Sequence, residues 1–191
     1  MNFLNIISKP KKTLRIINGI VLKEGEILNI YGEPYSGKTS LCFYIMKKNI
    51  NKNCLFVASE ILDFNYLNIL TDIFKKNKMD LYITNVSELW LIIDFIKEMP
   101  IDYVIIDSIT AVKIDDKKII EKFYDVIQKK KINAIIVSQT RNYKGKISYG
   151  NSKLINFYSY KIKVEKNNDK LILNNKYILD LNKIWLKGGE K

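Results

Sequence analysis

The feature that most restricts the fold of this chain is an eight-residue glycine-rich motif near its start. Residues 32–39 read Gly-Glu-Pro-Tyr-Ser-Gly-Lys-Thr, which fits the pattern G-x-x-x-x-G-K-[ST]. The apolar run 27–31 before it predicts a strand, and residues 38–48 carry apolar side chains that predict a helix. A phosphate-binding loop requires this order of strand, loop and helix. We therefore expect an α/β fold in which the loop holds the phosphates of a nucleotide.

The residue types in this motif explain how it would bind phosphate. Its glycines let successive backbone N–H groups point inward, and the following helix N-terminus adds a partial positive charge of about half a unit. Lys38 would neutralise the β and γ phosphates, and Thr39 would offer a hydroxyl ligand to Mg²⁺. Asp107 ends the apolar run 103–107, where a carboxylate is expected to hold the metal through a water. With ATP and Mg²⁺ as cofactors, the expected binding residues are Gly32, Glu33, Pro34, Tyr35, Ser36, Gly37, Lys38, Thr39, Ser40 and Asp107, of which Thr39 and Asp107 serve the metal.

The rest of the chain alternates short apolar runs with amphipathic stretches, which is typical of a parallel sheet covered by helices. Further strands are expected at 54–59, 81–84, 103–107 and 134–138, with helices at 63–76, 87–99 and 117–130. From residue 153 onward, polar turns at 167–169 and 174–175 predict antiparallel strands added at one sheet edge. We expect a single domain over residues 1–191, with a lead-in at 1–18, a core at 19–165 and C-terminal strands at 166–191.

Composition narrows the chemistry and the partners. The chain has no histidine, so a proton-relaying group must be a carboxylate or a lysine. The net charge of +12 favours a polyanion such as nucleic acid, although the lysine-rich composition of a biased genome would give the same charge. Cys42 and Cys54 lack a zinc spacing and predict reduced core thiols, which favours a cytoplasmic location. Because no apolar run reaches the roughly 18 residues of a span, no membrane partner is expected.

Several collinear segments resemble the RecA-like recombinases. They are 54–60 (Cys-Leu-Phe-Val-Ala-Ser-Glu), 105–109 (Ile-Ile-Asp-Ser-Ile), the pair Gln139 and Arg141 after a buried strand, and 150–154 (Gly-Asn-Ser-Lys-Leu). The likeness spans roughly residues 19–165 and implies a RecA-like P-loop NTPase core. Because the chain starts almost directly on this core, it is most similar to the short archaeal RadB-like paralogues, with a viral or minimal-genome relative as the alternative.

The resemblance also implies roles for single residues. Glu60 matches the water-activating glutamate and Gln139 the γ-phosphate sensor, so that with Lys38 they would form the catalytic set. By position alone, the favoured reading of Glu60 is a solvated loop residue, and that of Gln139 is the cap of a buried strand. The loop 140–149 matches a DNA-contacting loop, and it interleaves cations with aromatics as single-strand binding surfaces do. Its expected DNA-binding residues are Arg141, Tyr143, Lys144 and Lys146, and a merely solvated basic loop is the alternative.

The lengths of two segments limit what the resemblance implies. Segments 113–118 and 140–149 are shorter than the DNA-binding loops of full strand-exchange recombinases. We therefore expect an ATP- and DNA-binding recombinase paralogue of homologous recombination and repair, with weak ATP hydrolysis and a preference for single strands. It would assist a recombinase or another repair protein and could form a homo-oligomer. Two alternatives stay open, a KaiC-like signalling ATPase and a subunit that binds nucleotide without hydrolysing it.

Overall fold

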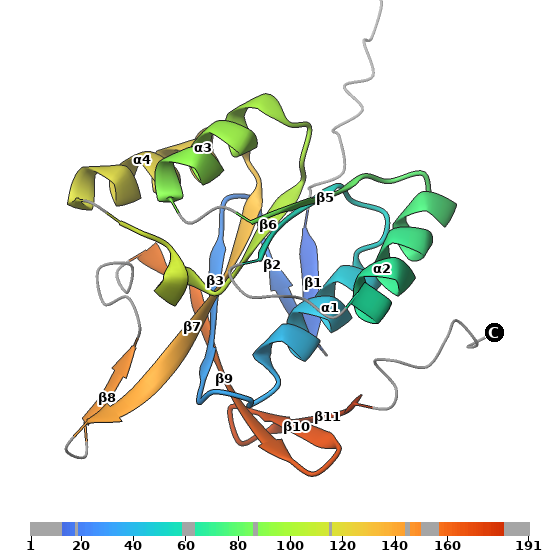
Figure 1. Cartoon of the computed structure of the whole chain (residues 1–191), viewed down its shortest axis with the longest axis vertical. Coiled ribbons are helices and arrows are strands. Elements are labelled where there is room, and N and C mark those ends of the chain that lie inside the picture. Colours follow the sequence, from blue (N-terminus) through green and yellow to red (C-terminus); the bar gives the residue numbers. More distant parts are fainter. Residues whose placement is uncertain are drawn as a thin grey trace, which may run out of the picture.

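The computed structural model describes residues 13–17, 19–58, 64–85, 88–114, 116–143, 146–149 and 157–181. Within these ranges the chain has a mixed α/β fold built on one large, mostly parallel sheet (Figure 1). Two residues of the expected site, Glu60 and Lys144, lie outside the described ranges, and so does the segment 150–154. The structure therefore leaves the roles expected for them as predictions.

The central sheet contains nine strands of the described residues. They are β3 (Ile27–Gly32), β4 (Cys54–Ala58), β5 (Leu81–Thr84), β6 (Tyr103–Asp107), β7 (Asn133–Tyr143), β8 (Lys146–Tyr149), β9 (Tyr160–Asn167), β10 (Lys170–Leu173) and β11 (Tyr177–Asp180). Their order is β11-β10-β9-β3-β7-β6-β4-β5, and β8 pairs with β7 outside this path. The strands from β9 to β5 are parallel, whereas β8, β10 and β11 run antiparallel to their neighbours. This order brings the carboxyl ends of β3, β7 and β6 side by side.

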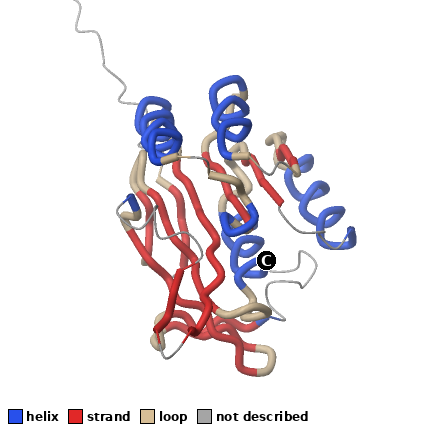
Figure 2. The backbone as a smooth tube through the Cα atoms, turned by 60° about the vertical axis from the view of Figure 1, so that its left-hand side comes forward, coloured by secondary structure: helices blue, strands red, loops and turns tan. Residues whose placement is uncertain are grey.

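The helices lie on both faces of the sheet (Figures 1 and 2). They are α1 (Lys38–Lys48), α2 (Phe64–Lys76), α3 (Leu89–Glu98), α4 (Lys117–Lys130) and the short 3-10 helix η1 (Ile109–Ala111). A small hairpin, β1 (Leu14–Ile17) with β2 (Ile20–Leu22), packs with α1 and α2 on one face, while α3 and α4 cover the other. Leu28 and Ile30 of β3 belong to the first buried cluster and Ile27 to the second, as the alternation of side chains along a strand requires.

Helix α4 illustrates how the sequence determines these elements. Its buried residues Ile120, Phe123 and Ile127 recur at three- and four-residue spacing and form one apolar stripe. The Asp116 side chain accepts a hydrogen bond from the Ile119 backbone N–H at 3.1 Å, an N-cap that contributes about 1 kcal/mol. Among the helices that the structure describes, none is long and apolar enough to cross a membrane.

Most predicted elements are confirmed. The elements expected at 27–31, 38–48, 81–84, 103–107 and 117–130 are present to within one residue at each end. The strand expected at 54–59 and the helices expected at 63–76 and 87–99 are also present, although residues 59, 63 and 87 lie outside the described part. The polar turns are confirmed too, because Asn168, Asn174 and Asn175 have φ values of 51°, 50° and 55°. Asparagine tolerates this left-handed conformation better than most residues.

Two expectations are corrected. Residues 140–149 were expected to form a loop, but β7 continues to Tyr143 and pairs antiparallel with β8. The apolar run ends at residue 138, yet backbone pairing between two strands does not require apolar side chains. The strands after residue 153 were expected to be antiparallel, but β9 is parallel to β3, and only β10 and β11 follow the expectation. The lead-in at 1–18 contains β1, which pairs with β2.

Candidate functional site

The loop between β3 and α1 depends on its two outer glycines. Gly37 is the N-cap of α1 with φ 87°, a left-handed conformation that suits a residue without a Cβ. A Cβ on Gly37 would lie 2.4 Å from Leu171 Cδ2, and one on Gly32 would lie 2.3 Å from the Val164 carbonyl oxygen. Because Val164 and Leu171 belong to β9 and β10, these strands pack closely against the loop. The packing of β9 and β10 thus helps to hold the loop in its conformation.

Lys38 lies folded over the same loop. Its Nζ donates hydrogen bonds to the Glu33 carbonyl oxygen at 2.6 Å and to Ser36 Oγ at 3.4 Å. The side chain is buried, and a buried ammonium group must be paired with polar groups to remain charged. The first turn of α1 contains no acidic residue and receives no side-chain cap, so its N-terminus keeps its partial positive charge. The loop therefore concentrates positive potential at one point.

Thr39 and Asp107 meet at the carboxyl end of β6. Thr39 Oγ1 donates a hydrogen bond to Asp107 Oδ2 at 2.6 Å, although the two residues are far apart in sequence. Both are oxygen ligands of the kind that Mg²⁺ prefers. No group of three or more His, Cys, Asp or Glu side chains that could hold a metal occurs in the described part of the chain. A divalent ion here would take its other ligands from water or from a bound phosphate.

Gln139 joins these residues through the strand order. It lies on β7, between β3 and β6, and it is in register with Gly32. All of these groups border one cavity of about 510 Å³. The residues that line it are Pro34, Tyr35, Gly37, Lys38, Thr39, Ser40, Asp107, Ser108, Gln139 and Lys166. The structure therefore brings most of the predicted binding residues to one cavity, whereas Gly32, Glu33 and Ser36 do not line it.

Sequence reasoning missed two residues of this cavity, Ser108 and Lys166. Ser108 follows Asp107 directly, so its place at the end of a buried strand is the signal that could have found it. Lys166 comes from β9, and no local pattern distinguishes it from the other lysines of the chain. Its position follows only from the parallel pairing of β9 with β3.

The remaining predicted residues either follow β4 in the sequence or belong to the segment 140–149. Glu60 is outside the described part, and Ala58, the last residue of β4, is in register with Asp107. The hairpin of β7 and β8 begins directly after Gln139, where Thr140 pairs with Tyr149. Within it, the backbone of Arg141 pairs with Ser148, and that of Tyr143 with Lys146. The expected DNA-binding hairpin thus shares a strand with Gln139.

The two cysteines lie in the protein interior, and one of them is affected by the charges of the site. Both cysteines are free and buried. Burial raises the pKa of the Cys42 thiol well above its usual value, the nearby Asp107 carboxylate raises it further, and Lys38 opposes the shift. Burial likewise raises the pKa of the Cys54 thiol. Because a thiolate and not a thiol is the nucleophile, neither cysteine is poised to react, and the prediction of core thiols is confirmed.

Neither protein-family models nor curated proteins match this chain. The function must therefore be inferred from the site, because one fold hosts many activities. The site offers a glycine-rich turn at a helix N-terminus, a buried lysine, a hydroxyl–carboxylate pair and an amide around one cavity. Together these groups can neutralise an anion, orient a cation and donate hydrogen bonds to an oxyanion.

Proposed function

We propose that this protein binds and slowly hydrolyses ATP on a RecA-like P-loop core, and that it binds DNA as an accessory recombinase paralogue in recombination and repair. The observation that carries the proposal is the convergence of Lys38, Asp107 and Gln139, with the hydroxyl of Thr39, on one cavity. Each residue was expected there from the sequence motif or from the resemblance. The net charge of +12 supports a polyanionic second ligand.

The residues present fit a nucleoside triphosphate with Mg²⁺. The oxygens that now accept from Lys38 Nζ are a carbonyl and a hydroxyl, and phosphate oxygens are stronger acceptors that can replace them. Gly32 and Gly37 lack the Cβ atoms that would collide with Val164 and Leu171, so the loop can keep its close packing against β9 and β10. Thr39 and Asp107 would hold the metal, which when bound neutralises part of the phosphate charge. ATP and Mg²⁺ are therefore the cofactors that we propose.

The chain's own residues divide the remaining tasks. Lys38 and the α1 N-terminus would stabilise the phosphate oxygens as negative charge develops on them. Gln139 carries an amide that donates and accepts hydrogen bonds but takes up no proton, so it would detect the terminal phosphate without acting as a base. With no histidine in the chain, we assign the water-activating role to Glu60, on the resemblance described above.

DNA binding is proposed for the hairpin of β7 and β8. It continues the strand that carries Gln139, and its sequence contains Arg141, Tyr143, Lys144 and Lys146. Cations that contact phosphates and an aromatic ring that stacks on a base are the usual features of a single-strand site. Because one strand joins the two sites, nucleotide binding at Gln139 would shift the population of hairpin conformations.

Binding measurements test this function directly. We expect fluorescence polarisation to show affinity for single-stranded DNA that rises with ATP and Mg²⁺ and falls with salt. Three hairpin cations on a single strand give a slope of log K against log salt of about −2. Negligible DNA affinity at low salt would contradict the recombinase proposal and favour a KaiC-like signalling ATPase. If Lys38→Ala abolishes partner binding while Glu60→Gln changes neither turnover nor binding, the protein is instead a non-hydrolysing subunit.

A further inference from the structure

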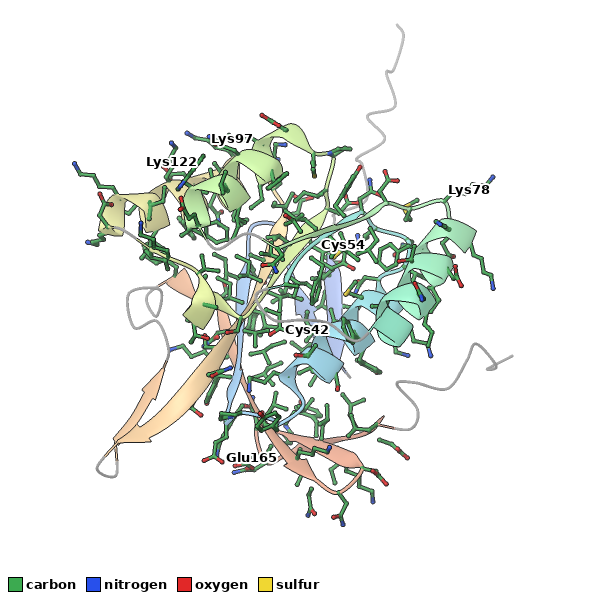
Figure 3. The ribbon with its side chains drawn as sticks, viewed as in Figure 1. Cys42, Cys54, Lys78, Lys97, Lys122 and Glu165 are labelled. Atoms are coloured by element: carbon green, nitrogen blue, oxygen red, sulfur yellow. The ribbon has the colours of Figure 1, made fainter. Side chains whose placement is uncertain are left out.

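A second cavity, of about 460 Å³, adjoins the first at the glycine-rich loop. It lies between that loop, β9 and the start of the β7–β8 hairpin, and it is lined by Tyr31, Tyr35, Thr140, Lys163 and Glu165 among others. Figure 3 labels Glu165 where β9 passes the loop between β3 and α1. The two cavities share Pro34, Tyr35 and Lys166. The proposed function does not use this second cavity.

The charged groups of the second cavity balance one another. Glu33 and Glu165 oppose Lys163 and Lys166, and Lys163 Nζ lies 2.5 Å from Glu165 Oε1. The hydrogen bond and charge of Glu165 raise the pKa of Lys163. A lining with as many carboxylates as ammonium groups does not favour a phosphate chain. Such a lining favours a neutral ligand whose N–H groups donate hydrogen bonds to the carboxylates.

The aromatic residues of this cavity indicate a flat ligand. Tyr31 and Tyr35 both line it, and Tyr35 is 97% exposed. The backbone of Tyr35 has φ 61°, a left-handed conformation that is an outlier for a bulky side chain. Such strain persists where the surrounding structure enforces it, and it is concentrated at binding and switching sites. The left-handed backbone of Tyr35 places its aromatic ring in solvent, where the two cavities meet.

We propose that the second cavity accepts one unstacked nucleobase, which stacks on Tyr35 and donates its amino or imino hydrogens to Glu33 or Glu165. Nucleobases combine a π-face with such donors, and proteins recognise unstacked bases in this way. The inference rests on the proposed function. Thr140 lines the cavity and begins the β7–β8 hairpin, so the base comes from a single strand bound along that hairpin. The base of a nucleotide held in the first cavity is the other source of the same chemistry.

The test uses the full chain and a dT oligonucleotide that carries a single 2-aminopurine, whose emission is quenched by stacking on an aromatic ring. We expect strong quenching by the wild type and by Tyr35→Phe, and little by Tyr35→Ala. The affinity of Tyr35→Ala for the strand should fall between about 5-fold and 150-fold, the range for losing one stacked base. Tyr160→Ala, a half-exposed tyrosine of β9 outside both cavities, is the matched control and should behave as the wild type.

A second arm replaces the strand with 2-aminopurine riboside triphosphate and Mg²⁺. Tyr35-dependent quenching in this arm alone would overturn the strand as the source of the base. Equal quenching by Tyr35→Ala and the wild type in both arms would overturn the inference, while unchanged DNA binding would leave the proposed function standing. Thermal melting of each variant checks its fold. Glu165→Gln weakens the hydrogen-bond acceptor at this position and leaves the Tyr35 ring in place. It should reduce affinity for a strand with 2-aminopurine more than for a strand with an abasic site.

Discussion

The hydrogen bond between Thr39 and Asp107 allows a quantitative test of the site. Thr39→Val keeps the branched shape of the side chain and removes the hydroxyl, whereas Thr39→Ser keeps the hydroxyl and serves as the matched control. The bond is charge-assisted, at 2.6 Å to a buried carboxylate. Hydrogen bonds to charged groups contribute about 1.5 to 3 kcal/mol, and because Thr39 is only half-buried we expect the lower end, about 1.5 kcal/mol.

Urea unfolding without nucleotide measures this contribution. Thr39→Val should lower the free energy of unfolding by about 1.5 kcal/mol, which corresponds to a fall in Tm of about 3 to 6 °C for a chain of this size. Asp107→Asn removes the charge on the acceptor, and a double-mutant cycle with Thr39→Val isolates the coupling between the two side chains. We expect a coupling energy of about 1.5 kcal/mol. Equal destabilisation by Thr39→Ser and Thr39→Val would show that the hydroxyl is not the cause.

The same variants then test the proposed role in metal binding. ATP at about 100 times its Kd should stabilise the wild type by about 2.7 kcal/mol. In Thr39→Val, ATP with EDTA should still stabilise the fold, because Lys38 and the loop are intact. The additional stabilisation that Mg²⁺ brings should shrink in Thr39→Val and persist in Thr39→Ser. An identical Mg²⁺ increment in Thr39→Val and the wild type would refute the assignment of this hydroxyl to the metal.

Further predictions address the loop, the interior and the hairpin. Lys38→Ala removes the ammonium group at the phosphates, so isothermal calorimetry should show ATP affinity reduced by about 10-fold to 150-fold. Gly37→Ala combines a left-handed φ with a Cβ 2.4 Å from Leu171 Cδ2, and urea unfolding should show a loss of about 2 kcal/mol. Burial raises the pKa of Tyr158 to about 12, above its ordinary value near 10, so the unfolded chain loses this proton first and stability falls as pH rises through that window. Tyr158→Phe should therefore lack about 2 kcal/mol of the decline that urea midpoints show between pH 10 and 12. Arg141→Ala should reduce the magnitude of the DNA salt slope by about 0.7 and weaken binding to all single-stranded sequences alike; a change confined to some sequences would contradict a phosphate contact.

The spacing and type of neighbouring residues were enough to predict the helices, strands and turns that form through contacts within one segment. The glycine-rich motif, the run 103–107 and the stripe of Ile120, Phe123 and Ile127 each determine an element through spacing that the sequence displays directly. The asparagine turns belong to the same class, since their left-handed residues are visible as residue types. The expected contact between Asp107 and the loop required more, namely that parallel strands end at one edge of the sheet.

The features that the sequence did not predict depend on pairing between strands that are far apart in the chain. Nothing near Lys166 indicates that β9 would lie parallel to β3 and bring this lysine to the cavity. The extension of β7 was missed because the run of apolar residues stops at Ser138, whose hydroxyl donates to Asn29 Oδ1 at 2.9 Å inside the sheet. A buried polar pair of this kind breaks the apolar pattern without ending the strand.

The position of β7 also gives a physical argument for linking the two proposed ligands. Gln139 is in register with Gly32 at the edge of the first cavity, and the next residue of the same strand, Thr140, lines the second cavity and pairs with β8. β7 pairs with β3 as far as Gln139 and with β8 from Thr140 onward, so a displacement of Gln139 is passed along a hydrogen-bonded strand and not a free loop. A ligand that moves Gln139 would therefore act on the hairpin through one peptide bond. The proposed coupling between nucleotide binding and DNA binding therefore runs along β7 itself. Gln139→Ala leaves the backbone pairing of this strand intact. It should lower the ATP-dependence of DNA binding more than it lowers ATP affinity.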